Sequence, residues 1–442
     1  MKKATIFYYK YGESILVSKD FMENYQSDST SIRLKVGNWS IEIPIEISLF
    51  LASNEIGIPE NLIPFDLPIS LSYEVTFLDN ILHLGPLIGI LLSKHPDKTL
   101  SKKRLKRLKM RLNEYQHLNG LIYVFSQAGI DHEKQIIKGH YYIPGKNKEK
   151  EKWIEGIFPF PDSLYNRIRL TEKMSESLVS VLGKRVFNTK HFDKAQLWKV
   201  CSSDELARSY VPDSIPYSGI EVLIEMINMH KHVYIKPIRG MQGKGIIVAK
   251  KSGDTTTFIT NDGTRIVCHN LEEITIFTTN YLNNRFGYIL QQGIDARYEK
   301  HKVDFRFYFQ KDQNANWVCQ GVVGRIAHED SIVTNYKYLS QVLSGSKAIQ
   351  LLFNVNEVEA TEIINTTALK CRYVCDLINQ KLGHYGDVAI DVILDSDRSP
   401  YILEINNRIY QTQSLNKLNE IELLTRISTT PLAYAKTLAG FK

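Results

Sequence analysis

Two acidic residues and an asparagine near the end of the chain have the spacing of a metal site. Glu404 and Asn406 lie two residues apart in an apolar run, and Asp391 lies in the apolar run before it. Both runs read as strands, in which side chains alternate between faces, so Glu404 and Asn406 point the same way and Asp391 can meet them from the neighbouring strand. Mg²⁺ prefers such oxygen ligands and commonly holds substrate phosphates through one or two carboxylates. The alternative is a solvated hairpin that carries ordinary surface acids.

A glycine-rich loop lies upstream, between two predicted strands. Gly240, Gly243 and Gly245 fall within six residues, a spacing that lets backbone N–H groups approach a polyphosphate without Cβ clashes. Lys236 ends the strand before the loop, where it can add a positive charge. The Walker A ending is absent and a strand follows, so the sequence predicts a hairpin that folds over phosphates. A plain β-hairpin with glycines at its turn is the alternative.

Two arginines interrupt apolar strands between the loop and the last hairpin. Arg306 is flanked by aromatic residues, and Arg325 lies in the apolar run 321–327. An arginine inside an apolar strand must find an anion. The anion is either a structural partner such as Asp304 or a phosphate or carboxylate ligand, which a guanidinium group binds bidentately. The strand-like segment Tyr288–Ile294 can present its backbone to an adenine edge, although a buried strand is the default interpretation.

The candidate residues must be positioned by a particular arrangement of strands and helices. Residues 1 to about 80 alternate polar and apolar types, which predicts β-strands, and strand and helix patterns alternate from about 185 onward, as in an α/β domain. The Phe-Pro-Phe-Pro-Asp run at 158–162 predicts a boundary. We therefore expect an N-terminal β-rich and mixed domain of unknown role over residues 1–165. A second region over 166–442 then has a first lobe at about 185–290 and a second lobe at 291–442.

The composition is that of an ordinary globular protein. The chain has 442 residues, 43% hydrophobic and 23% charged, which favours two or three domains. A net charge of +7 suits an anionic ligand such as a nucleotide and does not by itself argue for nucleic acid. Cys371 and Cys375 lie one helical turn apart in an apolar segment, where we expect two buried thiols. Without a recognisable signal peptide or a membrane span, we expect a cytoplasmic protein.

One further segment is strongly basic. Residues 102–111 contain seven basic residues, and Leu105, Leu108 and Leu112 recur at helical spacing, which predicts an amphipathic helix. A solvated helix face is one interpretation. The other is a docking element for an anionic partner or surface.

Taken together and in this order, the motifs resemble the ATP-grasp superfamily, and the sequence is most similar to its YheC/YheD-type branch, described as endospore coat-associated. The resemblance is carried by 83–90, 158–167, Phe187–Asn188 with Asp193–Lys194, the Lys236 loop, 304–306 and the last hairpin. It implies an α/β (α+β) ATP-grasp fold, in which two α/β subdomains clasp ATP, preceded by the β-rich N-terminal domain.

The resemblance also implies a role for each candidate residue. The phosphate and base contacts implied for ATP fall on Lys194 and Lys236 (α- and β-phosphates), Gly240, Gly243 and Gly245 (loop over the β- and γ-phosphates), and Gln291, Gln292 and Ile294 (hinge at the adenine). The implied Mg²⁺ ligands are Asp391, Glu404 and Asn406. The implied catalytic residues near the transferred phosphate and acyl group are Arg306 and Arg325.

Two positions depart from the family pattern. Asn335 follows Arg325, but the paired glycines that commonly come after the asparagine are absent. Ala195 follows Lys194, where the family usually has a tryptophan. The first departure concerns the substrate pocket more than the ATP site.

The chemistry implied by the resemblance is ligation. A carboxylate attacks the γ-phosphate of ATP, and an amine then displaces phosphate from the acylphosphate. We therefore expect an ATP- and Mg²⁺-dependent carboxylate–amine ligase for small-molecule or peptide substrates, with a cytoplasmic or spore-associated location. The alternatives are a non-catalytic nucleotide-binding or spore-coat-associated protein and an ATP-dependent phosphotransferase on the same scaffold. The basic helix then suits an anionic or coat-protein partner.

Overall fold

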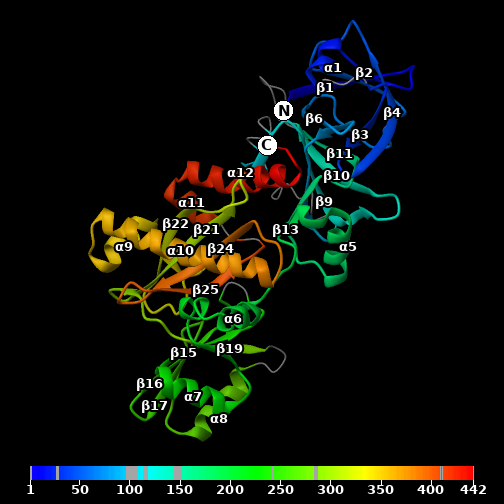
Figure 1. The fold of residues 1–442 in the computed structure, drawn as a ribbon. Helices are drawn as coiled ribbons and strands as arrows, with labels where there is room; N and C mark the ends of the chain where they lie inside the picture. Colours follow the sequence, from blue (N-terminus) through cyan, green and yellow to red (C-terminus); the bar gives the residue numbers. More distant parts are fainter. Residues whose placement is uncertain are drawn as a thin grey trace. The chain divides into compact units, whose positions relative to one another are not determined.

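The chain forms two compact units in the computed structural model, which describes residues 2–25, 29–95, 108, 110–112, 118–143, 152–240, 243–282, 287–408, 410 and 412–441 (Figure 1). Unit 1 comprises Met1–Lys190, Lys311–Asn316 and Thr425–Lys442, and unit 2 comprises His191–Gln310 and Trp317–Leu424. This division differs from the predicted boundary after residue 165: unit 1 continues to Lys190, and it also includes the last helix, which packs into its core.

Seven of the described strands of unit 1 close into a barrel in the order β1-β5-β2-β4-β3-β7-β6. They are β1 (Lys2–Tyr9), β2 (Ile15–Val17), β3 (Ser31–Val36), β4 (Trp39–Ile47), β5 (Glu55–Pro59), β6 (Ser72–Leu78) and β7 (Ile81–Gly85), with helix α1 at Lys19–Tyr25. Alternation along β3 buries Ile32, Leu34 and Val36 inside the barrel. The predicted β-rich N-terminal segment is confirmed.

A second sheet of unit 1 has the order β11-β10-β9-β8-β12-β13. Its strands are β8 (Leu87–Ser93), β9 (Leu121–Asp131), β10 (Ile136–Ile143), β11 (Lys152–Pro159), β12 (Ser163–Asn166) and β13 (Val186–Phe187). The helical elements are η1 (Met110–Leu112), α5 (Glu172–Leu182), η2 (Gly183–Arg185) and α12 (Ile421–Leu438). Leu432, Tyr434 and Ala435 of α12 belong to the same hydrophobic core as the barrel and this sheet.

The first sheet of unit 2 is antiparallel and has the order β14-β19-β15-β16-β17-β18. Its strands are β14 (Ser214–Pro216), β15 (His232–Pro237), β16 (Ile247–Ser252), β17 (Thr255–Thr260), β18 (Arg265–Cys268) and β19 (Tyr288–Gln292). Helices α7 (Ile220–His230) and α8 (Leu271–Tyr281) share a core with one face of this sheet (Figure 1). Val233 and Ile235 of β15 point into that core, so His232, Tyr234 and Lys236 point to the opposite face.

The second sheet of unit 2 has the order β23-β22-β21-β24-β25, with β20 paired to β21. Its strands are β20 (Arg297–Tyr298), β21 (His301–Lys311), β22 (Trp317–Ala327), β23 (Leu339–Ser344), β24 (Asp387–Leu394) and β25 (Pro400–Asn406). The helical elements are α6 (Lys194–Ser202), η3 (Ala207–Tyr210), η4 (Tyr336–Tyr338), α9 (Gly345–Phe353), α10 (Glu357–Lys381) and α11 (Gln413–Leu418). Phe305 and Phe307 of β21 share their core with Cys371 and Cys375 of α10, which confirms the two buried thiols.

The two α/β parts expected of an ATP-grasp fold are therefore present, each with its own sheet and core. Most of the predicted basic helix, residues 102–107 and 109, lies outside the described residues; Leu108 and Leu112 are buried in unit 1. None of the helices that the structure describes is long and apolar enough to cross a membrane.

Candidate nucleotide and metal site

Lys236 is the central cation of the candidate site. Its side chain is buried on the face of β15 away from α7, and Nζ donates a hydrogen bond to Gln291 Oε1 on β19. The Gln291 amide is fixed in turn, because its Nε2 donates to Ser214 Oγ at 3.2 Å. Burial, and then the nearby ammonium groups of Lys302 and Lys194, lower the pKa of Lys236 to about 7. A buried ammonium held by a neutral amide is prepared to receive an anion.

The predicted hinge begins where β19 ends. The Gln292 N–H donates to the Asp213 carbonyl at 2.7 Å, and the Gly293 N–H donates to the His232 carbonyl at 2.8 Å. Two backbone donors of the hinge are thus already used within the protein. The Ile294 N–H has no hydrogen-bond partner among the described residues, so it is the donor of this segment that remains available to a base edge.

Lys194 connects the phosphate loop to the last hairpin. It is the first residue of α6, whose N-terminus is fixed by a capping box between Asp193 and Gln196. Lys194 Nζ lies 3.2 Å from Glu404 Oε2 and donates to the Gly240 carbonyl at 3.4 Å. The predicted phosphate loop and a predicted metal ligand therefore meet at one ammonium group.

The glycine loop has the backbone that its sequence requires. Gly243 and Gly245 have φ of 70° and 72°, in the left-handed region that glycine adopts without a Cβ penalty. A Cβ added at Gly243 would lie 2.3 Å from Asn335 Nδ2 and 3.3 Å from Val333, so the loop packs closely against the segment after β22. The predicted strand–loop–strand is confirmed, since β15 and β16 pair on either side of it.

The two predicted catalytic arginines lie in a buried ionic network. Arg306 binds Asp391 bidentately, with Nε–Oδ1 and Nη2–Oδ2 distances of 2.8 Å. Arg325 binds Asp304 bidentately at 2.7 Å through both atoms, and its Nη2 lies 3.1 Å from Asp391 Oδ2. Thr334 also donates to Asp304. The structural partner of Arg306 is thus Asp391, and Asp304 is the partner of Arg325; register pairing places Arg306 opposite Asp391.

This network holds the carboxyl group of Asp391 ionised. Burial by itself raises the pKa of Asp391, but the guanidinium groups of Arg306 and Arg325 outweigh it and hold that pKa well below its usual range. Burial likewise opposes the charge of Arg325, and Asp304 and Asp391 nevertheless hold its pKa above its usual value. Asp391, Arg306 and Arg325 are therefore charged at neutral pH, and they form a fixed array of opposite charges beside the candidate site.

The three predicted metal ligands are adjacent and fit a phosphate-bound Mg²⁺. Asp391 lies directly opposite Glu404 in the β24–β25 register, and Asn406 Nδ2 donates to Glu404 Oε1 at 3.4 Å, leaving the Asn406 Oδ1 atom for a cation. A carboxylate accepts about four hydrogen bonds, and the arginines use three of those at Asp391. Within the described part of the chain no three His, Cys, Asp or Glu side chains gather as a metal site. A Mg²⁺ held by Asp391, Glu404 and Asn406 would take its other ligands from phosphate and water oxygens, as is usual for this ion.

Two further residues of this site were not predicted from the sequence. Lys302 Nζ donates to Tyr234 Oη at 2.5 Å, and both side chains are buried. The signal was present in the alternation of β21, which places Lys302 on the same face as Asp304 and Arg306. Tyr234 is likewise two residues before Lys236 on β15.

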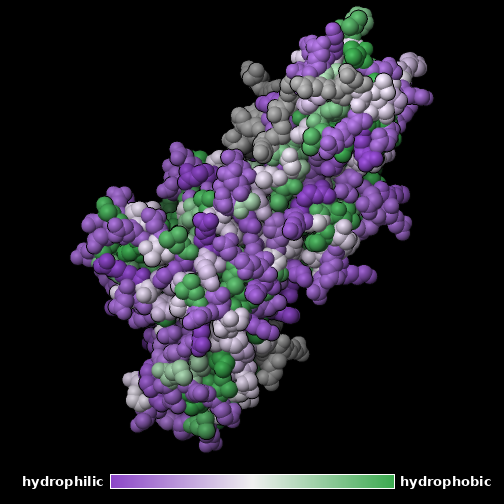
Figure 2. All heavy atoms as spheres, viewed as in Figure 1, coloured by the Kyte–Doolittle hydropathy of each residue, from purple (hydrophilic) through white to green (hydrophobic). Residues whose placement is uncertain are grey.

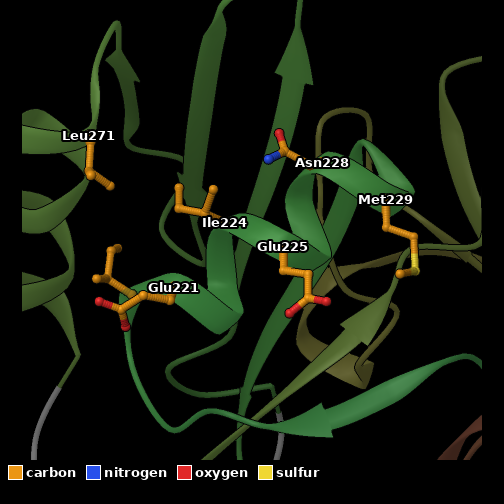
Figure 3. Close-up of a pocket in the computed structure, with 7 residues that line it drawn as sticks. Glu221, Ile224, Glu225, Asn228, Met229 and Leu271 are labelled. Carbon is orange, nitrogen blue, oxygen red and sulfur yellow. The ribbon is translucent and has the colours of Figure 1, made fainter.

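A surface groove of unit 2 lies elsewhere. It has a volume of about 740 Å³ and is lined by Ile220, Glu221, Ile224, Glu225, Asn228, Met229 and Leu271. Figure 3 shows these side chains along the outer face of α7 and at the start of α8, and Figure 2 shows hydrophobic atoms gathered over these helices. The groove is on the opposite side of the sheet from Lys236, because α7 covers the face into which Val233 and Ile235 point. It contains neither lysine nor glycine, and we do not assign the chemistry to it.

The site combines two α/β parts, two lysines that can bind phosphate, a glycine loop with positive φ, and two neighbouring carboxylates. This combination is typical of an ATP-grasp protein. A family model described as YheC/D like ATP-grasp matches residues 183–438, more than half of the chain. The chain belongs to this family. The match includes every candidate residue of the site, from Lys194 to Asn406.

Two curated relatives come from Bacillus subtilis. Endospore coat-associated protein YheD is 23% identical over 400 residues, which cover 83% of this chain and 84% of that protein. Endospore coat-associated protein YheC is 22% identical over 203 residues, or 45% of this chain and 54% of that protein.

Solved structures with a similar chain trace include two ligases. The D-alanyl-alanine synthetase A of Vibrio cholerae is 11% identical, with a TM-score of 0.41 over 79% of this chain and 99% of that chain. The VanG D-Ala:D-Ser ligase of Enterococcus faecalis is 12% identical, with a TM-score of 0.44 over 79% of this chain and 98% of that chain.

Proposed function

We propose that this protein is an ATP- and Mg²⁺-dependent carboxylate–amine ligase that works through an acylphosphate intermediate. The observation that supports this most is the Lys194 ammonium, which lies within 3.4 Å of both the Glu404 carboxylate and the Gly240 carbonyl. A triphosphate held by the glycine loop would therefore lie next to the metal ligands of the last hairpin. This proximity is what phosphoryl transfer from ATP requires.

The proposed reaction has two steps. A carboxylate oxygen of the acid substrate attacks the γ-phosphorus, the bond to the β–γ bridging oxygen breaks, and ADP leaves. The amine nitrogen then attacks the acyl carbon, phosphate leaves with the electrons of the C–O bond, and the amine proton passes to solvent. No covalent enzyme intermediate is needed, so the chain contributes position and charge.

Each candidate residue has a place in this scheme. Lys194 and Lys236 hold phosphate oxygens, and the loop Gly240–Gly245 donates backbone N–H groups. Arg306 and Arg325 stabilise the negative charge that develops on the transferred group. A Mg²⁺ held by the ligands Glu404, Asn406 and Asp391 supplies charge neutralisation of the phosphates when bound.

The substrates that fit this proposal are a small-molecule or peptide acid and an amine. The curated relatives YheD and YheC are named endospore coat-associated proteins, so a spore-associated or cytoplasmic location for this chain is part of the proposal. Nucleic acid is not among the proposed partners, because the net charge of +7 is modest for this length.

The metal assignment is tested by a double substitution, Asp391→Asn with Glu404→Gln. We expect wild-type protein to bind a non-hydrolysable ATP analogue about tenfold or more tightly with Mg²⁺ than without it, and the double variant to lose this dependence, because its metal carboxylates are gone. Calorimetry measures the binding, and a screen of acids and amines for ADP release measures turnover. Asp397→Asn, an exposed acid of the same hairpin, is the control. Undiminished ADP release by the double variant would refute the assignment.

One observation favours a second function, a non-catalytic nucleotide-binding protein. After Asn335 the chain forms the short η4 turn and then β23, where the family pattern has a glycine pair. A pocket for the acid and amine would thus be built differently in this chain from the pocket that the family pattern implies. This alternative predicts that the ATP analogue binds while no acid and amine pair in the screen releases ADP.

A further inference from the structure

Lys302 is a buried cation of the candidate site that has no carboxylate partner among the described residues. Along the site face of β21, Asp304 and Arg306 are paired with Arg325 and Asp391, respectively. Lys302, the next residue on this face, is 8% exposed, and its Nζ donates to Tyr234 Oη at 2.5 Å and to the Ile332 carbonyl at 3.4 Å. Both acceptors are neutral, and no ion pair within the described ranges includes Lys302.

Tyr234 brings this cation close to a second one. The centroid of its ring lies 4.2 Å from Lys302 Nζ and 5.1 Å from Lys236 Nζ. Lys236 also has a neutral partner, the Gln291 amide, whereas Lys194 is paired with Glu404. A ring face and neutral oxygens offset only part of the cost of burying two ammonium groups. Two such groups around one phenol ring therefore form a built site for an anion.

The direction of β15 decides which part of a nucleotide meets Lys302. The glycine loop follows Lys236 along the chain, whereas Tyr234 precedes it by two residues. Tyr234 lies opposite Gln291 in the register with β19, beside the start of the hinge. Lys302 is thus held between Tyr234, beside the start of the hinge, and Ile332, which precedes the Val333 that packs against the glycine loop. If the loop encloses the terminal phosphates and the hinge holds the base, Lys302 lies at the phosphate nearest the ribose.

We infer that Lys302 binds the α-phosphate of the nucleotide, with Tyr234 Oη holding its ammonium group in position. This inference rests on the proposed function, since it assumes that the site takes a nucleotide. It adds a third phosphate-binding lysine to Lys194 and Lys236, from the second sheet of unit 2. The α-phosphate is not transferred, so Lys302 is a binding and positioning residue.

The test compares a series of nucleotides that differ in one phosphate at a time. Adenosine, AMP, ADP and a non-hydrolysable ATP analogue are titrated with Mg²⁺ against wild type and Lys302→Met in competition with a fluorescent ATP analogue. We expect AMP, ADP and the ATP analogue each to bind about tenfold to hundredfold more weakly to the variant, because a charge-assisted hydrogen bond is lost. Adenosine should bind equally to both. Lys302→Arg, which keeps the charge, should restore part of the loss.

Matched controls separate binding from folding. Lys300→Met makes the same substitution two residues away at a lysine whose side chain is 79% exposed and paired with Glu329, and it should leave every affinity unchanged. Thermal unfolding of Lys302→Met should remain within a few degrees of wild type, because methionine suits a buried site against an aromatic ring.

The outcomes distinguish the inference from the proposed function. If Lys302→Met loses affinity for adenosine as much as for the phosphorylated nucleotides, the inference is overturned in favour of a contact with the base. If it loses affinity for the ATP analogue alone, Lys302 contacts the γ-phosphate instead. If it loses no affinity for any of them, Lys302 does not contact the nucleotide. If wild-type protein binds none of these nucleotides, the proposed function itself fails. If wild type binds them and Lys302→Met binds them as well, only the inference fails.

Discussion

At the scale of single residues, the environment of Lys236 makes the site sensitive to pH. Burial and two neighbouring ammonium groups lower its pKa to about 7, whereas a lysine in the unfolded chain has a pKa of about 10.4. Between these values the unfolded chain binds a proton that the folded chain does not bind. The contribution of Lys236 to the free energy of unfolding therefore rises as pH increases from 7 towards 10, and it is constant and least favourable below 7.

A bound phosphate should reverse the preference of folded Lys236 for its neutral form. An anion next to Lys236 favours the ammonium form and raises its pKa, so nucleotide binding should take up a large fraction of one proton at pH 8. Calorimetry in buffers of different ionisation enthalpy measures this uptake. In Lys236→Arg the guanidinium is charged before and after binding, so binding should persist while the uptake disappears. The same uptake in the variant would show that another group is responsible.

At the scale of elements, the loop between β15 and β16 combines two separate demands on glycine. Gly243 needs a positive φ of 70°, and it also approaches the side chain of Asn335 so closely that a Cβ would lie 2.3 Å away. Gly253, at the turn between β16 and β17, has a φ of 57° but nothing within 4 Å of an added Cβ. The two positions therefore separate the cost of backbone strain from the cost of contact.

We predict that Gly253→Ala costs about 1–2 kcal/mol of stability, the usual penalty for a side chain in the left-handed region, and leaves nucleotide affinity unchanged. Gly243→Ala should cost a similar or larger amount of stability. It should also weaken the binding of the ATP analogue about tenfold or more, because the loop must move away from Asn335. Chemical denaturation and calorimetry on both variants measure the two effects. Equal affinities for Gly243→Ala and wild type would mean that the loop does not contact the nucleotide.

The sequence predicted well which side chains share a face within a single strand, because polar and apolar residues alternate along it. It correctly placed Glu404 opposite Asp391 on paired strands and Lys236 at the end of the strand before the glycine loop. Which strand lies beside another could not be predicted in the same way. Arg306 pairs with Asp391, 85 residues away, because β21 and β24 are neighbours, and Lys302 contacts Tyr234 because two sheets meet there. Such contacts depend on the tertiary fold, which no local pattern contains.

At the scale of the whole molecule, the chain builds unit 1 from segments at both ends of the sequence. Helix α12 was expected within the second lobe, but Tyr434 is 1% exposed in the core of unit 1, with its ring centroid 5.2 Å from that of Phe187. Lys436 Nζ adds an ion pair of 2.5 Å with Glu74 on β6. By composition alone, the apolar residues of α12 could pack into the core of either unit. The helical pattern therefore did not predict which core they join.

This organisation predicts that the two units respond to different perturbations. Tyr434→Ala removes a buried aromatic ring and should destabilise unit 1 by about 3–5 kcal/mol, whereas Val374→Ala should destabilise unit 2 through the core of α10. An ATP analogue with Mg²⁺ should stabilise unit 2, because it binds the folded form of that unit. In calorimetric unfolding we therefore expect the analogue to restore the transition lowered by Val374→Ala and to leave the one lowered by Tyr434→Ala where it is. A single transition that both substitutions lower and the analogue restores would show instead that the two units unfold together.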